Sequence, residues 1–470
     1  MALKKGQEVT LTITGAAFKG KGVGKVDGMA VFVHGTAPGD TVRGRIIKKK
    51  KSFCEAKLLE IIEPSTDRIE PLCQHANVCG GCSWQHLPYA KQAEYKGQQV
   101  EDHVRRIAGL SETTVHPTLA CDQELYYRNK MEYSFSTRRW LTEAEIQSDE
   151  FVDDSAFAAG LHAPGRFDKI LNLNECQLQR KESFAILDYV RSYCVEHDIP
   201  AYDAYTHEGF MRHLMIRNAH HTEDFMVNIV TNADEPSIIQ PLADALLKEF
   251  PIISTIVNNI NDTKSPTSVG RIQKVLHGPG YIVDKIGGHS FKIHPNAFFQ
   301  TNTLQAEHLY EVARNYADLQ DGDVVYDLYC GVGTLSLFMS EKAHKVLGIE
   351  LVEVAVENAK FNAEENKVDN VSFVQGDMKD VFTEEMVEEF GAPDVLITDP
   401  PRVGMHPDVV ERLKQLKVPR LVYVSCNSST MARDLQELSE VYEVLEVQPV
   451  DMFPQTYHVE AVAKLRLKSS

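Results

Sequence analysis

Apolar and polar residues alternate along the first 62 residues in short runs separated by glycine and Asp-Gly turns, as in EVTLTITGAAF and GKVDGMAVFVHG. This pattern is typical of antiparallel strands. About five strands in so short a segment predict a small OB-type β-barrel, a fold that binds oligonucleotides. A small barrel that binds a protein partner is the alternative. Pro64-Ser65-Thr66 is predicted to be the linker that ends it.

From Gln305 onward, apolar runs of strand length alternate with helical patterns. The predicted strands are 324–329, 346–350, 371–375, 394–398, 421–425, about 441–448 and 459–466. Such alternation predicts a doubly wound α/β domain with a largely parallel sheet. The region 120–300 mixes strand-like pieces such as MEYSFSTRR with helical stretches such as SFAILDYVRSYCVEH, so a central α+β domain is expected there.

The stretch DVVYDLYCGVGTLSL combines the first of these strands with a glycine turn and a helix start, and the next strand ends at Glu350. Gly331 and Gly333 let the backbone approach a ligand closely. A carboxylate at a strand tip accepts hydrogen bonds from a ribose diol. The third glycine of the dinucleotide fingerprint and a Walker lysine are both missing. S-adenosylmethionine, a ligand with a ribose and no phosphate, therefore fits best; a βαβ unit without a ligand is the alternative.

Two later strands end in reactive side chains. VLITDPPRVG brings Asp399 to the ligand edge of the predicted sheet, and LVYVSCNSST brings Cys426 there. The helix start that follows Cys426 is expected to lower the pKa of its thiol, and a thiolate is the nucleophile of covalent catalysis. Glu460 opens the final strand, within reach of the same crevice. An inert buried cysteine and solvated carboxylates are the alternatives, and Cys330 is interpreted as a packing residue.

Charge is unevenly distributed along the chain. Residues 1–60 hold 12 Lys and Arg against 5 Asp and Glu, so they carry +7 while the remainder carries −25. A basic module on an acidic body indicates that the first module meets a polyanion; a solvated lysine run at Lys48–Lys51 is the alternative. No apolar run of membrane-spanning length and no signal-peptide block occur, which favours a cytoplasmic protein.

Three of the nine cysteines, Cys73, Cys79 and Cys82, form a C-x5-C-x2-C pattern with two glycines between the last pair. Disulfides are not expected in a cytoplasmic chain. Three close thiolates plus one distant thiolate are typical of iron–sulfur clusters, whereas structural zinc more often uses two close pairs. Free thiols are the third possibility. The fourth ligand is left open among the following residues: Cys54, Cys121, Cys176 and Cys194.

The motifs CGGCSWQH, HPNAFFQTN, DLYCGVGTLSL, DPPR, SCN and HVE occur in this order. With them the chain closely resembles, over essentially its whole length, the RNA 5-methyluridine methyltransferase family, in its TRAM-containing type that acts on 23S ribosomal RNA. The resemblance implies a TRAM domain at 1–62, a central α+β domain with a four-iron four-sulfur cluster at 63–297, and a Rossmann-like S-adenosylmethionine-dependent catalytic domain at 298–470. Part of 90–120 is expected to pack on the catalytic domain.

The resemblance also implies the role of individual residues. Cys426 would be the nucleophile and Glu460 the base. The residues expected to bind S-adenosylmethionine are Gln300, Tyr329, Glu350 and Asp399, with Asn302 and Asp377 as further candidates. The cluster ligands would be Cys73, Cys79, Cys82 and Cys176.

The expected reaction transfers a methyl group to carbon 5 of a uridine in 23S ribosomal RNA through a covalent Cys–uracil adduct, by a protein that acts as a monomer. Related 5-methylcytosine enzymes carry their nucleophile in a Pro-Cys after the fourth strand. This chain has Pro401-Arg402 there, which favours uracil. A methyltransferase of the same chemistry that acts on tRNA is one alternative, although such relatives generally lack the basic barrel and the cysteine cluster. A non-catalytic RNA-binding or ribosome assembly factor is the other.

Overall fold

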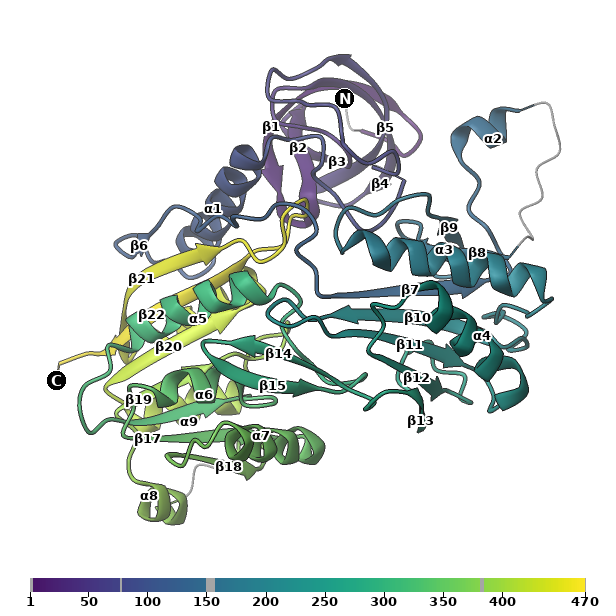
Figure 1. The fold of residues 1–470 in the computed structure, drawn as a ribbon. Coiled ribbons are helices and arrows are strands. Elements are labelled where there is room, and N and C mark those ends of the chain that lie inside the picture. Colours follow the sequence, from purple (N-terminus) through teal and green to yellow (C-terminus); the bar gives the residue numbers. More distant parts are fainter. Residues whose placement is uncertain (1–2, 77, 149–156, 381–383, 470) are drawn as a thin grey trace.

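The computed structural model of the protein describes residues 3–76, 78–148, 157–380 and 384–469. A small barrel sits above two larger lobes, one built on the central part of the chain and one on its C-terminal part (Figure 1). Among the described residues, no helix combines the length and the apolar composition that crossing a bilayer requires.

The N-terminal strands close into a five-stranded barrel in the order β1-β2-β3-β5-β4. The strands are β1 (Glu8–Ala17), β2 (Lys21–Val26), β3 (Met29–Val33), β4 (Thr41–Lys49) and β5 (Phe53–Glu63), with a short turn of 3-10 helix, η1 (Phe18–Gly20), after β1. Val9, Leu11 and Ile13 point into the barrel, and the residues between them are exposed. The apolar positions of the alternating sequence thus face the barrel interior and the polar positions face solvent. The predicted small barrel is confirmed.

The central lobe is a seven-stranded sheet in the order β13-β12-β11-β10-β7-β8-β9. Its strands are β7 (Lys130–Ser136), β8 (Ala158–His162), β9 (Ile170–Asn172), β10 (Met211–Asn218), β11 (Phe225–Thr231), β12 (Thr255–Ile260) and β13 (Ile272–His277). The short helix α2 (Glu143–Gln147) lies between β7 and β8 in the sequence. Helices α3 (Lys181–Glu196) and α4 (Pro236–Glu249) lie side by side on one face (Figure 1), where their apolar stripes bury the strands.

The C-terminal lobe is an eight-stranded sheet in the order β18-β17-β16-β19-β20-β22-β21-β6. Its strands are β6 (Thr114–Val115), β16 (Val324–Leu328), β17 (Lys345–Glu350), β18 (Val371–Gln375), β19 (Val395–Thr398), β20 (Arg420–Ser425), β21 (Tyr442–Val450) and β22 (Glu460–Leu467). The helices are α5 (Thr303–Ala317), α6 (Thr334–Ser340), α7 (Glu353–Glu365), α8 (Glu384–Phe390), α9 (Pro407–Leu416) and α10 (Ser428–Leu438). All seven strands predicted after Gln305 are confirmed, and the final strand, β22, runs antiparallel between β20 and β21.

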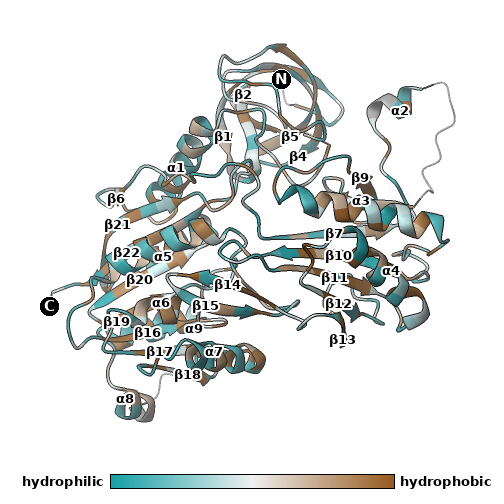
Figure 2. Ribbon diagram, in the orientation of Figure 1, coloured by the Kyte–Doolittle hydropathy of each residue, from teal (hydrophilic) through white to brown (hydrophobic). Residues whose placement is uncertain are grey.

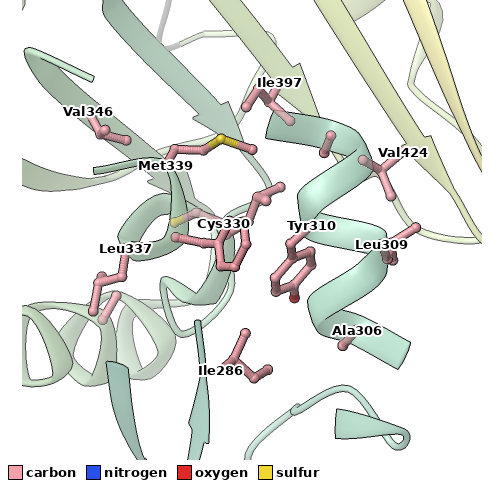
Figure 3. Packing of buried hydrophobic residues seen from close by; sticks show 14 of the residues in the cluster. Ile286, Ala306, Leu309, Tyr310, Cys330, Leu337, Met339, Val346, Ile397 and Val424 are labelled. Carbon is pink, nitrogen blue, oxygen red and sulfur yellow. The ribbon is translucent and has the colours of Figure 1, made fainter. Parts of the chain in front are cut away.

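The parallel strands of this sheet are apolar on both faces because helices cover both. Every residue of β19 is buried. Figure 3 shows one face, where Leu309 and Tyr310 of α5 and Met339 of α6 meet Ile397 and Val424 of the sheet. The hairpin of β14 (Ile282–Ile286) and β15 (His289–Ile293) closes this core from below. Figure 2 shows the strands as largely hydrophobic and the covering helices as carrying both kinds of residue.

One edge of the C-terminal sheet is completed by a segment that precedes the central lobe in the sequence. Strand β6 pairs in parallel with β21, with Val115 opposite Val447. Helix α1 (Tyr89–Arg106) lies beside β21 (Figure 1), and its Val100 and Val104 share a core with Leu435 of α10. The region 89–115 therefore contributes to the C-terminal lobe as well as to the connection with the barrel.

Candidate active site

A cavity of about 1530 Å³ opens at the carboxyl ends of the parallel strands of the C-terminal sheet. This is the edge at which open α/β sheets bind ligands. Its wall contains residues that follow β16, β19 and β20 directly and the last residue of β17. All six residues predicted to act in catalysis or cofactor binding line it: Gln300, Tyr329, Glu350, Asp399, Cys426 and Glu460.

Cys426 and Glu460 occupy facing positions at the floor of this cavity. Strands β20 and β22 are antiparallel, with Ser425 opposite Ala461. Cys426 is the first residue after β20 and Glu460 is the first residue of β22, so the same register sets them opposite each other. Facing residues of an antiparallel pair have Cβ atoms about 5 Å apart. A thiol and a carboxyl group can therefore flank one small planar ring.

Burial decides the protonation of the acidic groups around the cavity. It raises the pKa of Glu460 to about 8, and the carboxylate of Asp399 adds to this effect. It raises the pKa of Asp399 to about 6. It also raises the pKa of Asp327, beneath the glycine turn, to about 7, although Ser336 donates a hydrogen bond of 2.5 Å to that carboxyl. Groups that resist negative charge in this way favour a ligand that brings positive charge.

The thiol of Cys426 differs from the prediction made for it. Burial, together with the charges of Glu460 and Asp399, raises its pKa to about 11. The expected lowering of the thiol pKa by the start of α10 is therefore wrong in the absence of a ligand, because burial and two neighbouring carboxyls together outweigh the helix terminus. A cation held beside the thiol would reverse this balance.

Arg402 and its hydrogen-bond partner His458 are two residues at or next to the cavity to which the sequence interpretation gave no role. Arg402 lines the cavity and opposes the rise in the pKa values of Cys426 and Glu460. Its Nη2 donates to Nδ1 of His458 at 3.0 Å. Burial, helped by Arg402, lowers the pKa of His458 to about 4, so the ring is neutral and can accept this bond. An arginine that follows two rigid prolines at a strand tip was the available signal.

The glycine turn and Glu350 form the other side of the cavity. Oε2 of Glu350 accepts a hydrogen bond from the Gly331 amide at 3.1 Å, and Oε1 accepts one from the Val352 amide at 2.9 Å. Gly333 has φ +81, and a Cβ there would lie 2.8 Å from the ring of Phe373. Only glycine fits both constraints. The carboxylate is thus held at the strand tip beside exposed apolar side chains, a suitable surface for a nucleoside.

Of the two further candidates for cofactor binding, one lines the cavity and the other does not. Asp377 lines the cavity. Asn302 is buried and does not line it: its side chain caps α5 by accepting from the Gln305 amide, and its Nδ2 donates to the Met452 carbonyl at 3.1 Å. Its predicted place in the pocket is wrong, because the helix cap uses the side chain. Cys330 is buried in the core, as predicted.

Four cysteines, Cys73, Cys79, Cys82 and Cys176, lie around a second, much smaller cavity of about 20 Å³. Burial raises the pKa of both Cys79 and Cys82 to about 12, and the neighbouring thiols contribute. Four soft sulfur donors suit an iron–sulfur cluster. The cavity, however, has the volume of about one water molecule, and within the described part of the chain no group of three or more metal-ligating side chains has the geometry of a metal site. Cluster binding stays a prediction.

The raised pKa of Glu460 predicts a pH-dependent difference in stability between the protein and its Glu460→Gln variant. A buried carboxyl with a raised pKa binds its proton more tightly in the folded state, so the folded state loses stability as pH rises from the unfolded value of 4.5 towards about 8. Glutamine does not titrate. In melting experiments without ligand, the melting temperature of the wild type minus that of the variant is expected to fall between about pH 5 and pH 9. A constant difference would contradict the raised pKa.

Comparisons with known proteins agree with this geometry. The sequence model of the family described as tRNA (Uracil-5-)-methyltransferase matches residues 271–468. The model of the TRAM domain matches residues 2–59, which span most of the barrel. Relatives described as uncharacterized RNA methyltransferases cover nearly all of the chain. The one from Bacteroides thetaiotaomicron is 43% identical over 455 residues, 96% of this chain and 100% of the relative. The one from Chlorobaculum tepidum is 41% identical over 465 residues, 98% of this chain and 96% of the relative.

A solved structure shares the whole architecture. It is the Pyrococcus abyssi tRNA (uracil-54, C5)-methyltransferase in complex with S-adenosyl-L-homocysteine, with a TM-score of 0.75 and 29% sequence identity, covering 97% of this chain and 99% of that chain. The resemblance to the RNA 5-methyluridine methyltransferase family is thereby confirmed, as are the TRAM barrel and the Rossmann-like catalytic sheet, whereas the type that acts on 23S ribosomal RNA stays a prediction. The chain belongs to the TRAM-containing RNA uracil-5 methyltransferase family, and it is an S-adenosylmethionine-dependent RNA (uracil-5-)-methyltransferase.

Proposed function

We propose that the enzyme methylates carbon 5 of a uridine in 23S ribosomal RNA through a covalent adduct with Cys426, acting as a cytoplasmic monomer. The register of β20 and β22 is the main support for the proposed reaction, because it places the Cys426 thiol and the Glu460 carboxyl at facing positions in one large cavity. The membership of an enzyme family argues against the non-catalytic alternative.

Uracil chemistry assigns the two groups different steps. Carbon 5 is too weak a nucleophile to take a methyl group unaided. The Cys426 thiolate adds to carbon 6, a carbon–sulfur bond forms, and the ring becomes an enolate that is nucleophilic at carbon 5. Carbon 5 then takes the methyl group, which S-adenosylmethionine supplies as an electrophilic sulfonium. Glu460 removes the remaining proton from carbon 5, and the bond from carbon 6 to sulfur breaks as the thiolate leaves.

Gln300, Tyr329, Glu350 and Asp399 are proposed to bind S-adenosylmethionine. The Glu350 carboxylate, held by two backbone amides, is oriented to accept bonds from a ribose diol. Asp399 lies near Cys426 and Glu460, since its charge acts on both. A positive sulfonium beside these groups favours their charged forms. Cys426 would then become a thiolate and Glu460 a base only when the methyl donor is present.

The uridine must leave its stack before both groups can reach it. Two exposed apolar side chains of the cavity wall support this step: Phe298 is 70% exposed and Val403 is 72% exposed. Large apolar surfaces left open to water commonly receive a ligand, and a nucleobase has apolar faces of the required kind.

The proposal that the substrate is ribosomal RNA rests on the surface of the N-terminal barrel. Lys48–Lys51 are exposed on it, which suits contact with a long polyanion such as ribosomal RNA. The structural relative from Pyrococcus abyssi is described as acting on tRNA, and this favours tRNA as the second candidate. Mass spectrometry of 5-methyluridine in 23S ribosomal RNA and in tRNA from cells with and without this protein decides between them. Loss from tRNA alone would replace the ribosomal proposal.

Cys73, Cys79, Cys82 and Cys176 are proposed to hold a four-iron four-sulfur cluster, which the resemblance implies. Their four thiols around one enclosed space support the assignment, and thiolates are the ligands such clusters use. The methyl transfer moves no electrons, so the role of the cluster would be structural or in RNA contact.

Anaerobic purification is expected to give a brown protein with about four iron atoms per chain. Replacing Cys79 or Cys176 with serine should remove the colour and the iron, because a thiolate ligand is lost. Cys54→Ser is the matched control, since Cys54 is buried in the barrel and does not line this cavity. A colourless protein with stoichiometric zinc would overturn the iron assignment.

A further inference from the structure

The segment 451–459, which joins β21 to β22 and leads directly into Glu460, is an irregular stretch that is largely buried. Asp451, Met452, Pro454, Gln455 and Thr456 are all buried. Loops normally run over the surface because water satisfies their backbone groups. A buried loop needs hydrogen-bond partners from the rest of the protein instead.

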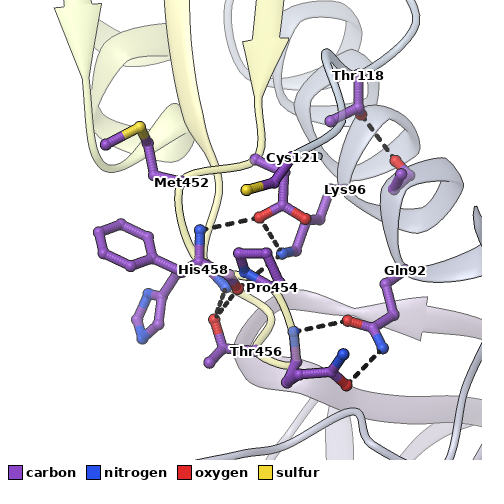
Figure 4. A network of polar contacts seen from close by, with 12 residues as sticks. Gln92, Lys96, Thr118, Cys121, Met452, Pro454, Thr456 and His458 are labelled. Atoms are coloured by element: carbon purple, nitrogen blue, oxygen red, sulfur yellow. Dashed lines mark hydrogen bonds and ion pairs between the residues drawn. The ribbon is translucent and has the colours of Figure 1, made fainter. Parts of the chain in front are cut away.

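Helix α1 supplies the first set of partners through Lys96. Its Nζ donates to Oδ1 of Asp451 at 2.6 Å and to the carbonyl oxygen of Phe453 at 3.0 Å. Oδ1 of Asp451 also accepts from the Phe453 amide at 2.9 Å. Both charged side chains are completely inaccessible to solvent. Figure 4 shows the ammonium reaching from α1 into the turn of the segment.

Gln92, one turn earlier on α1, fixes the next part of the segment. Its Oε1 accepts from the Gln455 amide at 2.8 Å, and its Nε2 donates to Oε1 of Gln455 at 3.0 Å (Figure 4). The Gln455 carbonyl accepts from the amides of Ser83 and Trp84 at 2.9 and 3.0 Å. Gln455 has φ +68, in the left-handed region that residues other than glycine rarely adopt. The hydrogen bonds around Gln455 therefore hold its backbone in a conformation that is unfavourable in the unfolded chain.

The segment carries two residues, and leads directly into a third, that line the cavity or contact a residue that lines it. Phe453 lines the cavity wall, His458 accepts the hydrogen bond from Arg402, and Glu460 faces Cys426. A buried ion pair adds little stability compared with apolar residues of the same size, and a role in fixing one geometry is a hypothesis to be tested for each protein. Here the pair fixes the residue directly after β21, and Val450, the last residue of β21, is the cross-strand partner of Glu460.

We propose that Lys96 is a positioning residue for proton removal. By binding Asp451 and Phe453, it fixes the position from which the Glu460 carboxylate reaches carbon 5 of the adduct. The inference rests on the proposed role of Glu460 as the base. It predicts that loss of the tether slows the final half of the reaction and leaves methyl-donor binding and thiol addition intact.

The test uses the double variant Lys96→Met/Asp451→Asn, because removing the lysine alone would leave an unpaired buried carboxylate that can prevent folding. We expect kcat to fall about 10²-fold, the effect of a misplacement near 1 Å. The dissociation constant of S-adenosylmethionine should stay within about twofold. The covalent RNA–protein adduct should accumulate on denaturing gels, and RNA deuterated at carbon 5 of uridine should show a primary isotope effect. Lys96→Arg, which keeps the charge, should recover part of kcat.

The matched control is Arg420→Met/Asp323→Asn, another largely buried pair, 2.8 Å apart, at the opposite end of the sheet. It should lower the melting temperature without accumulation of the adduct. Wild-type kcat in the Lys96→Met/Asp451→Asn variant, or a loss of kcat without adduct and without an isotope effect, overturns the inference. The Glu460→Gln variant distinguishes failure of the proposed function from failure of this inference. If it traps no adduct, Glu460 is not the base. If it traps an adduct while the double variant does not, Glu460 is the base but Lys96 does not position it.

Discussion

Cys426→Ala is expected to abolish methyl transfer while the protein still binds S-adenosylmethionine. The variant removes the only proposed nucleophile for carbon 6, so the ring never becomes an enolate and carbon 5 never becomes nucleophilic. Removing the nucleophile of a covalent mechanism costs a factor on the order of 10⁴ or more in kcat. Three of the proposed cofactor residues, Tyr329, Glu350 and Asp399, lie at the ends of other strands, and the substitution is not expected to alter their backbone. Transfer of labelled methyl groups to RNA measures the first effect, and calorimetry measures the second.

Cys194→Ala is the matched control for this variant. Cys194 is a buried thiol on α3 of the central lobe and does not line the catalytic cavity. Its substitution should leave methyl transfer near the wild-type rate. Full activity of the Cys426 variant would remove this thiol from the mechanism and, with it, the covalent adduct.

Glu460→Gln is expected to stop the reaction one step later and to trap RNA on the protein. Thiol addition and methyl transfer need no base at carbon 5, whereas the elimination that releases the RNA needs the carbon 5 proton to leave. Glutamine keeps the shape of the side chain but cannot accept this proton. A fall in turnover of about 10²- to 10⁴-fold is expected, the usual contribution of general-base catalysis. A slower band on a denaturing gel, sensitive to ribonuclease, identifies the adduct.

The double variant Cys426→Ala/Glu460→Gln tests the order of the two steps. Without the thiol no adduct can form, so the slower band should disappear. A band that persists would assign the covalent bond to another side chain. The absence of the band in Glu460→Gln itself, with turnover lost, would mean that Glu460 acts at or before thiol addition and is not the base that removes the carbon 5 proton.

Much of the catalytic lobe follows from local sequence. A strand buried on both faces needs a continuous apolar run, and a ligand turn needs glycines, so β16, β17, β19 and β20 were predicted to within one or two residues. Their tips, and hence Tyr329, Glu350, Asp399 and Cys426, follow from the rule that ligands bind at the carboxyl edge of such sheets. The facing of Glu460 and Cys426 depends on the register of two strands, which the spacing of their sequences leaves open.

Features that depend on distant contacts could not be predicted in this way. Spacing alone left Cys176 one of four candidates for the fourth cluster ligand, because the chain brings it to the turn around Cys79 only through contacts between distant segments. The raised pKa of Cys426 depends on burial in the folded lobe and on two carboxyls, Glu460 and Asp399, that lie at the ends of other strands. Lys96 gave the sequence interpretation no signal at all, since a lysine on an amphipathic helix is normally solvated.

The pairing of β6 with β21 affects which fragments of the enzyme can be expressed and when the catalytic lobe can fold. A fragment that begins at the start of α5 would leave the outer strand of the catalytic sheet uncovered, together with the apolar surface of α10 on which α1 rests. Open strand edges recruit other chains. The N-terminal portion emerges first from the ribosome and must wait for the last strands before it finds its partner. We therefore expect the catalytic lobe to mature only after β21 and β22 have been synthesised, and to aggregate when expressed without residues 89–120.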